Sequence, residues 1–168
     1  DHEELGVILF AFSIVQFIIP IGGFGLHQSL IRYGALLKSN DGKEKLFSYV
    51  FKNGVMGSLI LIALVTIIGR TIPFQYENTY ENLCLLSIAI LSHFIFELVK
   101  TQFRLQHKNK IFAQAEFWQN VLLVCLIFIL STFFNGLGYI IALVSSPLIA
   151  SLFFFILVTV NVFFKNKI

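Results

Sequence analysis

The sequence predicts an all-α fold, a polytopic bundle of five membrane-spanning helices. Of its 168 residues, 57% are hydrophobic and 12% are charged, a composition that would leave a soluble domain with too much apolar surface in water. The apolar residues form five long segments, at residues 5–26, 50–68, 83–99, 112–134 and 137–164. Helices are predicted rather than a β-barrel, because a helical span needs about 20 apolar residues whereas a membrane strand has about 10 of alternating polarity. Since the connections are short, residues 1–168 are expected to form a single transmembrane bundle.

The first segment, residues 5–26, is interrupted near its end by proline and glycine. Pro20 removes a backbone hydrogen bond, and Gly22, Gly23 and Gly25 favour a kink or local unwinding. Broken helices of this kind line the cavities of transporters, so these four residues are a candidate hinge. The alternative is that the glycines only allow neighbouring helices to pack closely.

The later segments are expected to follow one another as antiparallel hairpins. The polar residues 38–45 have the composition of a turn and join the first two segments. The last two segments are separated by little more than Asn135 and Gly136. A connection this short predicts that the last two helices are close neighbours.

Basic residues mark alternate connections of the predicted bundle. Arg70 lies on one side, and the other Lys and Arg residues lie on the opposite side: Arg32, Lys38, Lys43, Lys45, Lys52, Lys100, Arg104, Lys108, Lys110, Lys165 and Lys167. The positive-inside rule therefore places the C-terminus in the cytoplasm and the N-terminus outside. Because the chain begins at Asp1 with no initiator Met or signal peptide, we expect it to be an internal fragment that lacks one earlier helix.

Several classes of function are not supported by the residues present. The net charge of +3 reflects bases that set topology, so no nucleic-acid binding is predicted. Cys84 and Cys125 lie in apolar segments without metal-ligand spacing and are expected to be buried small hydrophobic residues. Aspartate occurs only at Asp1 and Asp41, which excludes an Asp-rich diphosphate–metal motif, and no HExxH pair is present. We therefore predict no catalytic residue, metal or cofactor.

Polar residues recur at helical spacing at the end of the first segment. Gly25, Gln28 and Arg32 are at positions i, i+3 and i+7, which places them on one helix face. An arginine on such a face is suited to a pyrophosphate, because its planar guanidinium donates two parallel hydrogen bonds. The alternative is that Arg32 reaches the membrane interface and only sets topology.

A longer polar stripe lies on the third segment and beyond it. His93, Glu97, Lys100 and Arg104 are at positions i, i+4, i+7 and i+11 of one helix face. A carboxylate inside a membrane is costly unless it is paired, protonated or facing a wet cavity, so Glu97 is a functional candidate. The alternative is that Glu97 is only an intrahelical partner for Lys100 or Thr101. Glu116, at the start of the fourth segment, is a further acid that can form an ion pair with the bases of this stripe across the hairpin.

Three stretches of the sequence share the pattern of an apolar helix next to a basic turn: GFGLHQSLIRYGALL at residues 23–37, KEKLFSYVFKNGVMGSLILIAL at 43–64, and LVKTQFRLQHKNKIFAQAEFWQNVLLVCLIFIL at 98–130. Together they resemble a family of polysaccharide-exporter flippases. Flippases of this kind belong to the multidrug/oligosaccharidyl-lipid/polysaccharide exporter superfamily. The resemblance implies a MATE-like fold of roughly twelve to fourteen helices in two lobes around a central cavity. The five predicted helices would be helices two to six of the N-terminal lobe.

The resemblance also implies a function in the bacterial inner membrane. The expected substrate is an undecaprenyl-diphosphate-linked oligosaccharide, exported for surface polysaccharides such as the O-antigen of lipopolysaccharide. Membrane lipids, a polymerase and glycosyltransferases are the expected partners. The predicted substrate-binding residues are Arg32, Gln28, Arg104 and Glu97, of which the first three are expected to hold the diphosphate. Two alternatives are a multidrug exporter that uses Glu97 as a cation-linked acid and a membrane scaffold that transports nothing.

Overall fold

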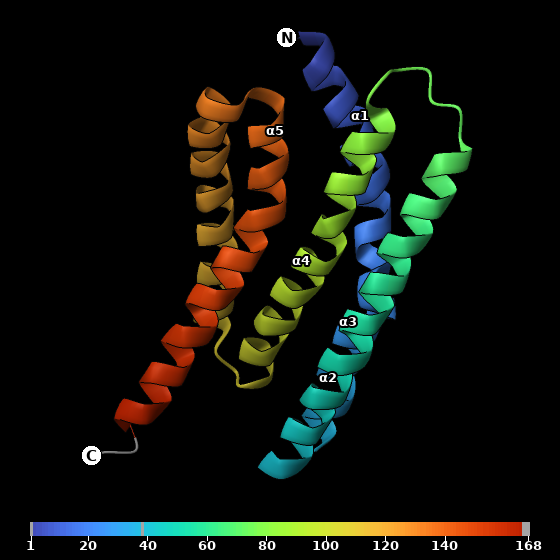
Figure 1. Ribbon diagram of the computed structural model, residues 1–168. Helices are drawn as coiled ribbons and strands as arrows, with labels where there is room; N and C mark the ends of the chain where they lie inside the picture. The colour runs from blue at the N-terminus through green and yellow to red at the C-terminus, as the bar shows by residue number, and fades with distance from the viewer. Residues whose placement is uncertain (1, 38, 166–168) are drawn as a thin grey trace.

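The computed structural model describes residues 2–37 and 39–165, and this part of the chain is helical without any strand. The elements are α1 (His2–Ile18), the 3₁₀ helix η1 (Ile19–Gly25), α2 (Leu26–Leu36), α3 (Asn40–Thr71), α4 (Thr79–Leu105) and α5 (Asn109–Lys165) (Figure 1). The α3–α4 connection lies at the same end of the bundle as the start of α1, and the α4–α5 connection lies toward the other end. The all-α prediction is therefore confirmed.

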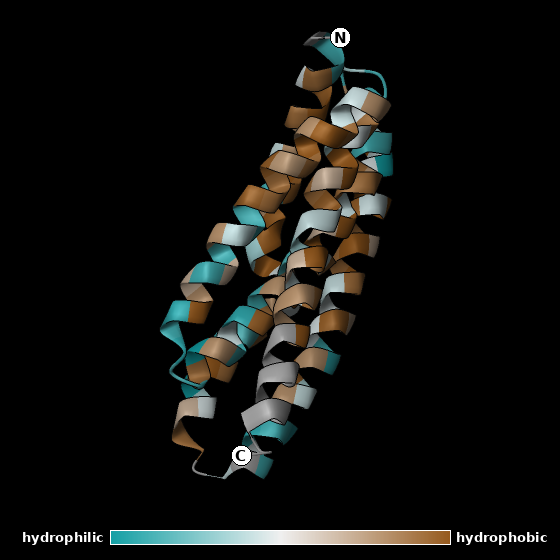
Figure 2. Ribbon diagram, turned by 90° about the vertical axis from the view of Figure 1, so that its left-hand side faces the viewer, coloured by the Kyte–Doolittle hydropathy of each residue, from teal (hydrophilic) through white to brown (hydrophobic). Residues whose placement is uncertain are grey.

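Long apolar helices dominate the bundle. Among the described residues, four helical stretches are long and apolar enough to cross a membrane: Glu3–Leu36, Asp41–Thr71, Thr79–Leu105 and Asn109–Ile156. Large apolar side chains face outward, with Phe17 83% exposed and Phe128 77% exposed. Figure 2 shows hydrophobic residues along most of the length of the helices. Lipid rather than water suits such a surface, so the chain is a membrane protein. Cys125 is on this exposed surface, so the expectation that it is buried was wrong.

The predicted count of five separate helices is not confirmed, because the last two predicted segments are continuous in α5. Only Asn135 departs from helical dihedral angles within α5, with φ 51° and ψ −129°. The ribbon reverses direction there, and the two arms of α5 run back along each other (Figure 1). The side-chain amide of Gln119 donates a 3.4 Å hydrogen bond to Ser146 Oγ across the two arms. The arms are thus neighbours, as the short connection predicted.

Several helices extend beyond their predicted ends. α3 begins at Asn40 rather than at residue 50, so most of the predicted turn at 38–45 is helical. Ser39 caps this helix, because its Oγ accepts a 3.2 Å hydrogen bond from the Gly42 backbone N–H. Lys45 and Asp41 form an ion pair of 2.7 Å on the first turns. Apolar runs mark the part of a helix that lies in lipid, whereas the helix itself continues through charged residues.

α4 is the central helix of the described bundle and packs against α1, α2, η1, α3 and α5. Over half of its most apolar window, 56%, is buried, compared with 22% for the stretch that includes α1. Small residues lie in the core cluster that α4 shares with α1, since Ala89 and Ala11 are both fully buried there. Polar residues on α4 are therefore carried into the interior of the bundle.

The predicted interruption of the first helix is present as η1. Gly23, Phe24 and Gly25 have φ values of 65°, 51° and 67°, which end α1 and set a new direction for α2. A Cβ atom on Gly23 would overlap the ring of Phe94 on α4. Only glycine satisfies both the positive φ and this close approach, so the break is fixed against the central helix.

Candidate functional site

The four residues predicted to bind substrate line one cavity of about 430 Å³ between α2 and α4. Gln28 and Arg32 come from α2, and Glu97 and Arg104 come from α4. The remaining lining residues are His27, Ile31, Thr101 and Phe112. We call this space the arginine cavity. Helical spacing places each pair on one face of its own helix, and the packing of α2 on α4 brings the two pairs into one site.

The α2 wall of the arginine cavity offers hydrogen-bond donors. Gln28 and Arg32 are exposed, one helical turn apart. His27 is half-buried, and its Nδ1 atom is buried without a hydrogen-bond partner among the described residues. α2 lies close to α4 at Gly34, which has no side chain. A Cβ atom there would be only 3.0 Å from Leu105 Cδ1. This close packing brings the donors to the polar stripe of α4.

A buried lysine organises the α4 wall. The Lys100 side chain is 5% exposed, and its Nζ is 2.7 Å from Glu97 Oε1 and 3.5 Å from Glu116 Oε1. The same ammonium lies 5.0 Å from the ring centroid of Phe96 and 5.4 Å from that of Phe112. Two acids and two aromatic faces thus compensate one buried charge. The intrahelical pairing with Lys100 that was the alternative for Glu97 is therefore present, and Glu116 approaches the polar stripe from α5.

The charge available to a ligand comes from the two arginines. In the part of the chain that the structure describes, neither Arg32 nor Arg104 has a carboxylate within 4.0 Å. Arg104 lies beside Phe112, with 6.0 Å between its Cζ and the ring centroid. Glu97 shares the Lys100 ammonium with Glu116, so this cluster keeps one net negative charge, and the two arginines still give the group of five side chains a net positive charge. The cavity is suited to a ligand with two or more negative charges.

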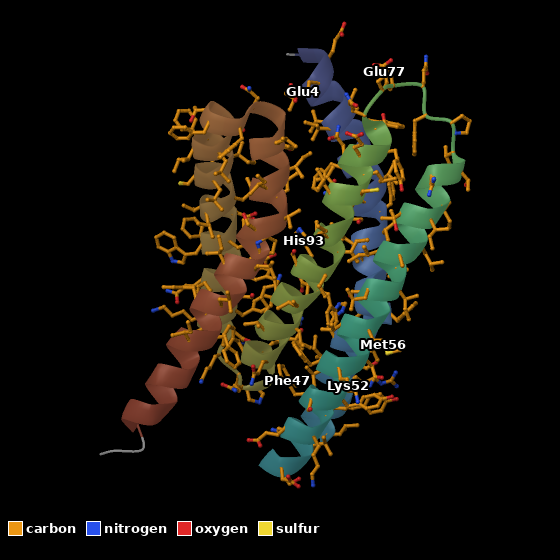
Figure 3. All side chains as sticks on the ribbon, viewed as in Figure 1. Glu4, Phe47, Lys52, Met56, Glu77 and His93 are labelled. Carbon is orange, nitrogen blue, oxygen red and sulfur yellow. The ribbon has the colours of Figure 1, made fainter. Side chains whose placement is uncertain are left out.

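The hinge candidates lie beside the arginine cavity and do not line it. Gly22 and Gly23 are buried against α4, Pro20 is exposed at the start of η1, and Gly25 directly precedes α2. They set the direction in which α2 presents its donors. His93 is half-buried on α4 and does not line this cavity; Figure 3 shows it between the two ends of the bundle.

Sequence reasoning did not identify every residue of this site. Lys100 was recognised as part of the stripe, but its depth depends on how α5 packs against α4. Thr101 is 3% exposed and lines the cavity, and it lies one turn from Glu97. His27 adjoins Gln28, yet nothing in the sequence shows that its Nδ1 lacks a partner. The i, i+4 spacing from Glu97 was the one signal that pointed to Thr101.

Comparison with known protein families supports the resemblance seen in the sequence. The family described as polysaccharide biosynthesis protein matches residues 1–168, the whole chain. The chain belongs to this family. No curated protein and no solved structure matches the chain. Together with the apolar helices, the match identifies a membrane protein of the polysaccharide biosynthesis family.

Proposed function

We propose that this polysaccharide biosynthesis protein is part of a flippase that moves a polyprenyl-diphosphate-linked oligosaccharide across the bacterial inner membrane. The observation that carries the proposal is the arginine cavity, which Arg32 and Arg104 line from different helices without an ion pair to an acid among the described residues. A diphosphate presents adjacent anionic oxygens, which two guanidinium groups bind in a bidentate manner. The family match supports a glycan as the cargo.

Binding by two helices links substrate recognition to movement. Arg32 and Gln28 belong to α2, which begins after the break at Pro20–Gly25, whereas Arg104 belongs to the central α4. α2 already packs against α4, so a diphosphate held by both helices stabilises this arrangement, and release of the diphosphate allows the two helices to separate. This proposal needs no bond to form or break, so the protein acts as a transporter and not as an enzyme.

The multidrug-exporter alternative is less well supported. An acid that binds a cationic drug or a coupling ion must have a free carboxylate, yet Glu97 is 2.7 Å from the buried Lys100. The two arginines at the same cavity also repel cations. A scaffold without transport activity would have no need for this arrangement of donors.

Substitution of the two arginines in the full-length protein tests the proposal in cells. We expect Arg32→Gln and Arg104→Gln each to lower surface polysaccharide several-fold, and the double variant to lower it at least tenfold while lipid-linked precursor accumulates. Arg32→Lys should restore export only in part, because an ammonium lacks the planar fork. Lys52→Gln is the matched control, since Lys52 is exposed and does not line the cavity. Normal export by a well-expressed double variant would overturn the proposal.

A further inference from the structure

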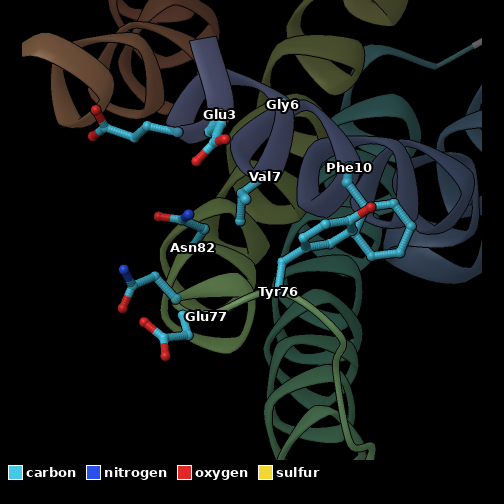
Figure 4. Close-up of a pocket in the computed structure, with 9 residues that line it drawn as sticks. Glu3, Gly6, Val7, Phe10, Tyr76, Glu77 and Asn82 are labelled. Atoms are coloured by element: carbon cyan, nitrogen blue, oxygen red, sulfur yellow. The ribbon is translucent and has the colours of Figure 1, made fainter. Parts of the chain in front are cut away.

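A second cavity, of about 760 Å³, lies at the opposite end of the bundle, between the starts of α1 and α4 and the segment that precedes α4 (Figure 4). We call it the acidic cavity. Glu3, Glu4 and Glu77 line it, and none of its lining residues is Lys or Arg. Figure 3 shows Glu4 and Glu77 near one end of the bundle and Lys52 toward the other. The two cavities therefore differ in charge as well as in position.

Helix ends explain part of this composition. Glu3 and Glu4 are in the first turn of α1, where the helix dipole favours acids. The dipole does not explain Asn82, which is 9% exposed and lines the cavity. Its backbone N–H is bonded to the Asn78 carbonyl at 3.0 Å, but its side-chain amide has no hydrogen bond among the described residues.

The Asn82 amide therefore points to a ligand. Figure 4 shows it directed to the same side as the carboxylate of Glu77. Because Asn82 is 9% exposed and lines the cavity, a ligand with both donors and acceptors can form the side-chain hydrogen bonds that this amide lacks. Carboxylates accept hydrogen bonds only, whereas an amide both donates and accepts. The complementary ligand carries several hydroxyl groups.

Aromatic rings complete the wall of the acidic cavity. Phe10 and Tyr76 pack edge to face with 6.4 Å between ring centroids, and both line the cavity. Each ring is about half exposed, at 45% and 54% for the whole residues. The C–H face of a sugar ring packs on such a surface while its hydroxyls reach carboxylates and amides. No three His, Cys, Asp or Glu residues of the described chain are grouped to hold a metal, which favours an organic ligand.

We propose that the acidic cavity binds sugar residues that carry no negative charge, either neutral or amino-substituted. The carboxylates of Glu3 and Glu77 repel uronic and other acidic sugars and attract an ammonium group. The assignment to the transported glycan rests on the proposed function, whereas sugar binding itself does not. A site at this end would hold the glycan at the opposite end from its diphosphate.

Ligand binding to the full-length protein in lipid nanodiscs tests this assignment. The probes are a neutral N-acetylglucosamine tetramer, the amino glucosamine tetramer and a galacturonate tetramer, observed by saturation-transfer NMR. We expect saturable binding of the first two and none of the third. Glu77→Gln should weaken the amino tetramer about fivefold, and Asn82→Leu should weaken the neutral tetramer at least tenfold. Glu81→Gln is the matched control, because Glu81 is exposed near this end and does not line the cavity.

The outcomes separate this inference from the proposed function. Absence of saturable sugar binding, equal binding of galacturonate, or an equal loss in Glu81→Gln would overturn it. If Asn82→Leu fails to fold, Tyr76→Ala replaces it, because Tyr76 is exposed and lies outside the helices. The Arg32→Gln/Arg104→Gln variant should bind the tetramers normally, and Glu77→Gln should bind inorganic pyrophosphate normally. Loss of sugar binding at the acidic cavity and loss of pyrophosphate binding at the arginine cavity are thus measured separately.

Discussion

Lys100 is far more buried than the two acids that pair with it, and this difference predicts unequal losses of stability when the partners are replaced. Its ammonium is 5% exposed, whereas the side chains of its partners Glu97 and Glu116 are 42% and 53% exposed. Removing the lysine leaves two acids that water can reach, but removing Glu97 leaves a buried ammonium with one carboxylate at 3.5 Å. Replacing Glu97 should therefore lower the free energy of unfolding more than replacing Lys100.

The magnitude follows from this burial. Breaking a fully buried pair costs about 3–5 kcal/mol when the remaining charge is uncompensated. Because Glu116, Phe96 and Phe112 still contact Lys100, we expect Glu97→Gln to cost about 2–3 kcal/mol. Lys100→Met keeps the apolar stem and leaves half-exposed acids, so we expect about 1 kcal/mol.

Unfolding of the purified full-length protein by SDS, followed by circular dichroism, measures both values. The double variant Lys100→Met/Glu97→Gln should cost no more than Lys100→Met alone, since the uncompensated ammonium is gone. Lys110→Met, at an exposed lysine, is the control and should change stability little. The reasoning is refuted if Glu97→Gln costs less than Lys100→Met, or if the two single costs add in the double variant.

Two further predictions concern how the helices pack. Gly23→Ala should cost about 2–3 kcal/mol in the same SDS unfolding, because Gly23 has φ 65° and its Cβ would overlap Phe94. Gly6→Ala, where a Cβ meets nothing within 4 Å, should be neutral or slightly stabilising; equal costs at both glycines would contradict the packing of η1 on α4. Gln119→Leu and Ser146→Ala should show a coupling energy of about 0.6 kcal/mol in a double-mutant cycle, as is typical of hydrogen bonds between membrane helices. Zero coupling would show that this hydrogen bond does not contribute.

The sequence predicted most of what depends on local patterns. Apolar segment length identified the membrane helices, and the spacing of Gln28 with Arg32 and of Glu97 with Arg104 placed each pair on one face. The Pro20–Gly25 interruption was also predictable, because proline and glycine change the backbone conformation at their own positions. These features were predictable since each arises within a single helix.

Features that depend on packing were not predictable. The depth of Lys100 arises from the contact of α4 with Phe112 and Glu116 of α5. The acidic cavity combines α1 with residues more than sixty positions later, and its key residue, Asn82, has no distinctive sequence context. The apolar segments located the reversal at Asn135, but the count of helices differed because this single residue joins the two arms of α5 without a loop, which segment lengths do not reveal.

The most direct test of the central claim is transport by the full-length protein reconstituted into proteoliposomes. The substrate is a fluorescent polyprenyl-diphosphate oligosaccharide, and loss of fluorescence to a membrane-impermeant quencher reports its movement between leaflets. We predict transport by the unmodified protein and by Lys52→Gln, with at least a tenfold slower rate for Arg32→Gln/Arg104→Gln. Transport by the double variant at the unmodified rate would contradict the claim that the arginine cavity binds the diphosphate.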